Sequence, residues 1–195
     1  MKYCKIQHPI EGWIDYNPRS YQLEILKELE SGNNIIVNAA RHLGITSTIF
    51  QYLANIIDKG LDQNILIVYP TSAYNMYDRF TDMLVYNDVN NILDYRTKIF
   101  FWNYKKLYRS YGLYLKFDRV FIENSDCIDD LGGLFDKLTP FCNDIKFIGN
   151  AGNMDGYKSL NYPYTVNPVW NDDWVKCQRE LLGDDLFDRE YNIKF

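Results

Sequence analysis

Hydrophobic residues fall into short continuous runs that alternate with amphipathic stretches. The apolar runs are 34–38, 65–70, 98–103, 119–124 and 144–149. They are continuously apolar rather than alternating, which is typical of strands buried on both faces of a parallel sheet. Helical patterns lie between them at 46–59, near 72–85, briefly after 103, and near 128–138. This order predicts an α/β fold, a mostly parallel sheet between two layers of helices.

A further helix is predicted ahead of the first strand, in the stretch NPRSYQLEILKELESG. Pro18 sits just before it, and Gly32 suits the left-handed residue that ends a helix. Leu23, Leu26 and Leu29 recur at helical spacing, so we expect them to form its buried face.

The two ends of the chain are predicted to differ. Residues 1–16 form an N-terminal extension without a clear pattern, whereas 167–195 predicts one or two helices and a short final strand. At 195 residues, the chain is expected to form a single domain.

Charge and composition narrow the function classes. The formal net charge of -5 argues against bulk attraction to nucleic acid, although a local basic patch stays open. The four cysteines lack paired metal-ligand spacing, so we expect reduced thiols. No apolar run approaches the ~20 residues that span a bilayer, and we expect a soluble intracellular protein.

The stretch NAARHLGITST lies between a predicted strand and a predicted helix, where phosphate-binding loops occur. On the pattern G-x-x-x-x-G-K-[ST], Ala39 replaces the first glycine and Ile45 replaces the lysine. Gly44, Thr46 and Ser47 remain as candidate nucleotide-binding residues, with the Thr46 hydroxyl placed to hold magnesium. Because Gly44 and the helix start remain, we expect the backbone cradle to persist, but the positive charge of the lysine is lost.

The stretch RVFIENSD ends a predicted buried strand and stands where a nucleotide hydrolase carries an acidic pair. Glu123 is a candidate magnesium ligand together with Thr46. Asn124 cannot accept a proton, so it cannot act as the general base. Asp126 is expected to begin or cap the following helix, with replacement of the missing base as the less favoured alternative.

In this order, these pieces resemble the ATPase domain of the large terminase subunit, the DNA-packaging motor of tailed bacteriophages. The resemblance implies a P-loop NTPase fold of the RecA type, with three layers. It also implies that Tyr21 and Gln22 contact adenine and that Arg41 is directed at the transferring phosphate. Tyr21 and Gln22 as ordinary helix residues, and Arg41 as a surface loop residue, are alternatives that stay open.

The resemblance covers roughly 16–195 and includes the tail DDWVKCQRELLGDDLFDREYNIKF, which is similar to the segment that closes the terminase ATPase domain. The stretch FIGNAGN stands where that family has its coupling loop, which implies such a role for Asn150 and Asn153. Simple turn chemistry is the favoured alternative there. The chain ends where the family continues into its nuclease domain, so we do not expect DNA cleavage.

The stretch YKKLYRSYGLYLK interleaves basic and aromatic residues. Lys105, Lys106 and Arg109 are therefore a candidate nucleic-acid patch. The favoured alternative is an amphipathic helix whose tyrosines pack while its lysines are solvated.

Taken together, the sequence predicts a degenerate motor domain that binds no ATP, or binds ATP and Mg²⁺ weakly. We expect phage packaging proteins, a host protein or DNA as partners, in the cytoplasm of an infected bacterium. An active packaging ATPase with deviant motifs is the main alternative, and a helicase-like translocase fragment is a weaker one. The oligomeric state stays open.

Overall fold

A six-stranded sheet with parallel pairing throughout forms the centre of the molecule, in the order β5-β4-β6-β7-β3-β8. The computed structural model describes residues 3–8, 10–70, 76–89, 96–109, 115–149, 151–152 and 154–192. The strands are β3 (Ile35–Ala39), β4 (Gln63–Tyr69), β5 (Thr97–Asn103), β6 (Arg119–Glu123), β7 (Ile145–Ile148) and β8 (Lys158–Tyr162). The prediction of a mostly parallel sheet is confirmed.

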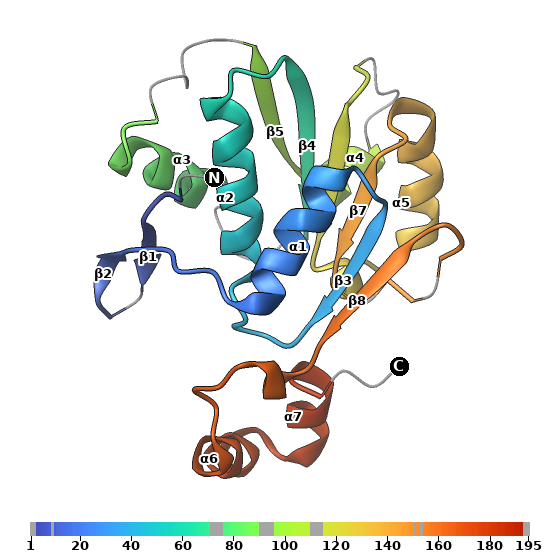
Figure 1. Cartoon of the computed structure of the whole chain (residues 1–195). Coiled ribbons are helices and arrows are strands. Elements are labelled where there is room, and N and C mark those ends of the chain that lie inside the picture. The colour runs from blue at the N-terminus through green and yellow to red at the C-terminus, as the bar shows by residue number, and fades with distance from the viewer. Residues whose placement is uncertain are drawn as a thin grey trace.

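Helices cover both faces of this sheet (Figure 1). On one face lie α1 (Ser20–Ser31), α2 (Ile45–Asp58) and α3 (Met76–Tyr86), and on the other α4 (Tyr104–Arg109) and α5 (Leu131–Leu138). Single 3-10 turns occupy Ser125–Cys127, Thr139–Phe141 and Tyr164–Val166. The predicted three-layer arrangement is therefore confirmed.

Successive residues of each inner strand pack into the two apolar clusters on opposite faces of the sheet. In β4, Ile65 and Ile67 join the cluster beneath α1, α2 and α3, whereas Leu66 and Val68 join the cluster beneath α4 and α5. All four side chains are fully buried. Side chains alternate across a strand, so a strand between two apolar layers needs apolar residues at consecutive positions.

Helix α1 confirms most of its predicted pattern. Gly32 ends it with a φ of 76°, in the left-handed region. Leu26 and Leu29 are buried, but Leu23 is 47% exposed, so its predicted burial was wrong. At 100° per residue, Leu23 lies on the opposite side of the helix from Ile25, which is fully buried and marks the core face.

Three elements differ from the sequence prediction. Strand β8 was not predicted, and the N-terminal extension contains a hairpin of β1 (Ile6–His8) and β2 (Gly12–Ile14). Helix α5 begins only at Leu131, because Asp130 caps it by accepting a hydrogen bond from the Gly133 N–H. Asp126 lies in the preceding 3-10 turn, so its predicted capping role was wrong.

The tail forms a small helical unit beyond the carboxyl ends of the strands (Figure 1). It contains α6 (Asp172–Leu182) and α7 (Asp184–Glu190), which confirms the predicted helices. The final residues 193–195, where the short strand was expected, lie outside the described residues. None of the helices in the described part of the chain is both long and apolar enough to cross a bilayer.

Two leucines of α1 provide a test of the observed helix orientation. We expect Leu29→Ala, at a fully buried site, to lower the free energy of unfolding by about 2–5 kcal/mol. The matched variant Leu23→Ala should change the free energy of unfolding by no more than about 0.5 kcal/mol, because about half of that side chain is exposed and it lies away from the core face. Urea denaturation monitored by circular dichroism would measure both. Equal losses in the two variants would contradict the helix orientation.

Candidate functional site

Two segments meet at the carboxyl edge of the sheet because of its strand order. Strand β7 lies between β3 and β6, and its Ile148 is paired with Val37 on one side and with Glu123 on the other. Glu123 is thus level with Val37, two residues before the end of β3, and lies about 10 Å from it across two strand spacings. The loop after β3 bridges this distance, so the loop and the Glu123 side chain form one site.

Hydrogen bonds from α1 hold the backbone of this loop. The Tyr21 hydroxyl and the Gln22 Nε2 group both donate to the Leu43 carbonyl, each over 3.0 Å. Gly44 follows with a φ of 74° at the N-cap of α2, and a Cβ there would lie 2.9 Å from Gln22 Nε2. Tyr21 and Gln22 are nearly buried, at 5% and 6% exposed. Tyr21 and Gln22, for which the resemblance implied adenine contact, therefore stabilise the backbone of the loop in this structure.

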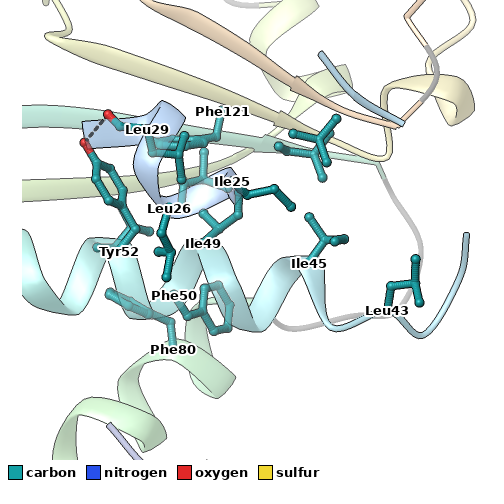
Figure 2. Close-up of a cluster of buried hydrophobic side chains, with 14 of the residues drawn as sticks. Ile25, Leu26, Leu29, Leu43, Ile45, Ile49, Phe50, Tyr52, Phe80 and Phe121 are labelled. Atoms are coloured by element: carbon teal, nitrogen blue, oxygen red, sulfur yellow. Dashed lines mark hydrogen bonds between the residues drawn. The ribbon is translucent and has the colours of Figure 1, made fainter. Parts of the chain in front are cut away.

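Ile45 fills the core at the position of the missing lysine. It is 8% exposed and belongs to the large apolar cluster that also contains Leu43 and Ile49. Figure 2 shows Ile45 and Ile49 in line along the face of α2 that is turned toward the sheet. The loop thus has an apolar anchor on each side of Gly44, and the side chain at position 45 is directed into the protein.

Thr46 and Glu123 come together as the sequence predicted for a magnesium site. The Thr46 hydroxyl lies 3.4 Å from Glu123 Oε2. Glu123 is 2% exposed, and within the described residues its Oε1 atom has no hydrogen-bond partner. Burial raises the pKa of Glu123 from 4.5 to about 7, opposed by the Thr46 hydrogen bond and the charge of Arg79. A carboxylate oxygen without a partner beside a hydroxyl fits a hard divalent cation. Ser47, next along α2, is partly exposed.

The residues after Glu123 form a tight turn. Asn124 is exposed and has a φ of 47°, while the buried Ser125 Oγ has no partner among the described residues. Gly149 packs against this turn with a φ of 119°, and a Cβ there would lie 2.8 Å from the Ser125 nitrogen and closer still to Asp126. The loop after β7 therefore contacts the end of β6 directly. Its Asn150 and Asn153 lie outside the described residues.

Arg41 is paired with the tail. Its guanidinium forms an ion pair with the Glu190 carboxylate, and its backbone N–H donates to the Glu190 carbonyl over 3.1 Å. The Arg41 side chain is still 61% exposed. Sequence reasoning did not identify Glu190, because no local pattern links two residues so far apart in the chain.

The basic stretch on α4 follows the amphipathic alternative where the structure describes it. Tyr104 is buried, and Lys105 is exposed with its Nζ atom 5.8 Å from the centre of the Tyr104 ring. The side chains of Lys106 and Arg109 lie outside the described residues. This contact does not test nucleic-acid binding, so the nucleic-acid role of the basic stretch stays a prediction.

No protein-family model and no curated protein matches the sequence. Solved structures do match. The large terminase of a thermophilic bacteriophage has a TM-score of 0.65 at 13% identity, over 90% of this chain and 53% of the terminase. The large terminase ATPase domain of Thermus phage P74-26 also has a TM-score of 0.65, at 11% identity, over 92% and 94% of the two chains.

The chain has the fold of a phage large-terminase ATPase domain. It spans about half the length of the first of these terminases and nearly all of the P74-26 domain. The Sulfolobus solfataricus SWI2/SNF2 ATPase core in complex with double-stranded DNA is similar over 78% of this chain and 34% of its own, with a TM-score of 0.55 at 15% identity. At these identities the likeness establishes the fold alone.

The burial of Glu123 gives a pH-dependent prediction. Its pKa is about 7 in the folded protein and 4.5 without burial, so the folded state binds the proton more tightly. Below about pH 4.5 the Glu123 carboxyl is protonated in both states and its ionisation does not lower the free energy of unfolding. As the pH rises from 4.5 through 7, the free energy of unfolding decreases. Glu123→Gln removes this titration. Relative to wild type, the variant should gain about 3 kcal/mol of unfolding free energy between pH 4.5 and 8.

Urea denaturation of both proteins across this pH range would measure the difference. All other ionisable groups are common to the two proteins, so their contributions cancel to first order. A difference that stays constant with pH would show that Glu123 is not buried in this way.

Proposed function

We propose that this protein is a terminase-like P-loop domain that has lost ATP hydrolysis and acts by binding. One observation carries the proposal: Ile45 is packed into the core at the lysine position, while the Thr46 hydroxyl lies 3.4 Å from Glu123 Oε2, which supports a magnesium site there. In this proposal the frame of a nucleotide site remains, and a buried apolar side chain stands in place of the cation that would stabilise the transferring phosphate.

Two separate losses support the absence of turnover. Phosphoryl transfer depends on positive charge around the phosphate oxygens, and removal of one such cation costs about 10³-fold or more in rate. Asn124 follows Glu123 where a base would polarise the attacking water, and an amide cannot accept that proton. Its side chain is exposed on a left-handed backbone rather than buried beside Glu123.

The remaining groups fit weak binding of Mg²⁺ and a nucleotide. Thr46 and Glu123 would hold the ion, which would supply positive charge beside the phosphates. The first turn of α2 would offer backbone N–H groups to the anion. Without a lysine, the attraction for a triphosphate would rest on these groups and on Arg41.

Binding partners follow from the fold by analogy. Phage packaging components, DNA or a host protein are the proposed partners, in the cytoplasm of an infected bacterium. The similarity to large terminases and to an ATPase core in complex with double-stranded DNA supports this assignment.

A phosphate-release assay tests the loss of hydrolysis. The protein is incubated with Mg·ATP, with and without double-stranded DNA. We expect no release above the buffer control, because the lysine and the base are both missing. Turnover in the ordinary enzyme range of about 1–10³ s⁻¹ would refute the proposal.

An active ATPase with deviant motifs is the second candidate, and Arg79 is the observation that favours it. Burial raises the pKa of the Glu123 carboxyl, and the positive charge of this α3 residue, together with the Thr46 hydrogen bond, opposes that rise only in part. In this second candidate, Arg79 would be the substitute for the lysine. If the assay shows turnover, Arg79→Gln should abolish it.

Restoring the missing groups tests whether the cradle persists. The double variant Ile45→Lys with Asn124→Glu should bind Mg·ATP about tenfold or more tightly than wild type, since an ammonium group is costly in the apolar cluster around Ile45 and should turn outward to the phosphates. Isothermal titration calorimetry measures the affinity. Leu61→Lys with Asn124→Glu is the control, because it makes the same charge change with the lysine at an exposed site beyond α2. Equal affinities in the two double variants would show that the loop no longer fits a phosphate.

A further inference from the structure

Glu190, at the end of α7, contacts both the backbone and the side chain of Arg41 in the loop after β3. The Arg41 backbone N–H donates to the Glu190 carbonyl over 3.1 Å, and the Arg41 guanidinium pairs with the Glu190 carboxylate. Arg41 is the only Lys or Arg in the loop stretch NAARHLGITST. The positive charge that the loop retains is therefore paired with a carboxylate from the tail.

The Glu190 carboxylate is shared between two arginines. Its Oε2 atom faces Arg41, and its Oε1 atom accepts from Arg189 Nη2 over 3.2 Å. The Glu190 side chain is 13% exposed, whereas the Arg41 side chain is 61% exposed. An anion in solution can therefore approach Arg41 while Glu190 still holds it.

The residue after Glu190 connects this contact to the aromatic cluster of the tail. Tyr191 is 5% exposed, and its ring centre lies 5.7 Å from that of Trp170 and 5.4 Å from that of Trp174. On the other side it lies 6.4 Å from the ring of His42, in the loop itself. A displacement of Glu190 from the loop would therefore change the surroundings of both tryptophans.

We propose that Glu190 is an internal competitor for phosphate, and that a triphosphate entering the loop takes Arg41 from it and releases the last turn of α7. This inference rests on the proposed function, since it requires that the loop accepts a polyphosphate. A guanidinium presents the same planar donors to a carboxylate and to a phosphate. Nucleotide occupancy of the loop is thereby transmitted to the tail.

The strength of the competing pair sets the expected effect. The Arg41 side of the pair is 61% exposed, and ion pairs whose cation is solvated contribute little, so the loss of this pair corresponds to about a two- to fivefold change in an equilibrium constant. A multiply charged triphosphate can therefore displace Glu190 at accessible concentrations. A stronger, buried pair would keep the loop closed to anions.

The first experiment compares affinities for inorganic tripolyphosphate and for Mg·ATP by isothermal titration calorimetry. Glu190→Gln removes the competing charge and should bind both ligands about two to five times more tightly than wild type. Asp185→Asn is the matched control, because it makes the same charge change at an exposed site on α7 that precedes the contact with Arg41. Its affinity should stay close to that of wild type. Arg41→Gln should bind both ligands several times more weakly.

The second experiment reads the tail directly through tryptophan emission. Saturating tripolyphosphate should change the emission of wild type, and Glu190→Gln should already show the changed emission without ligand. A protein in which Trp170 and Trp174 are both replaced by phenylalanine should lose this response, since only Trp13 and Trp102 remain.

The outcomes separate this inference from the proposed function. Ligand binding with equal affinities in Glu190→Gln and Asp185→Asn would overturn the competition and leave the binding function in place. Binding without a change in emission would overturn the transmission to the tail. Absence of binding in every variant would overturn both. Measurable ATP turnover together with the predicted affinity differences would overturn only the loss of hydrolysis.

Discussion

Burial of the Glu123 carboxylate at the end of β6 is the constraint on which the site depends. The sheet places this group between two apolar layers, where the Thr46 hydroxyl lies beside one oxygen and the other has no partner in the described part of the chain. A buried carboxylate in this position favours its protonated form unless a cation is supplied. The fold therefore maintains a destabilising polar group where the loop after β3 can bring an ion and its ligand. Structural stability alone would favour an apolar residue there.

Apolar packing and hydrogen bonds within the protein stabilise the loop beside Glu123 without a ligand. Leu43 and Ile45 insert into the core, and Tyr21 and Gln22 donate to the carbonyl between them. A lysine at position 45 would instead require water or an anion for its ammonium group. Isoleucine at the position where the phosphate-loop pattern has lysine thus removes a cation and adds a buried apolar side chain in the same step. The stability of this loop and its proposed lack of catalysis have a common physical origin.

Sequence reasoning worked where a residue's environment is decided locally. The strands from β3 to β7 were predicted because a strand between two apolar layers must be apolar throughout, and the approach of Thr46 to Glu123 followed from the motif order. Strand β8 was missed because it is an edge strand with largely exposed residues, so its sequence carries no continuous apolar run. The exposure of Leu23 depends on which face of α1 meets the sheet, and the pairing of Arg41 with Glu190 depends on how the tail folds back. Neither can be read from neighbouring residues.

The position of the tail follows from that unpredicted strand. Strand β8 pairs with β3 up to Ala39 and Tyr162, and the next N–H, from Ala40, donates to the Tyr162 carbonyl over 2.9 Å. The chain therefore leaves the sheet beside the start of the loop, and the return of α7 brings Glu190 to Arg41. A loop with a lysine at position 45 would keep one unpaired positive charge when Glu190 pairs with Arg41. Here Arg41, the one Lys or Arg of the loop stretch, is already paired with Glu190, so under the proposed binding function the tail competes with anions for the charge of the loop.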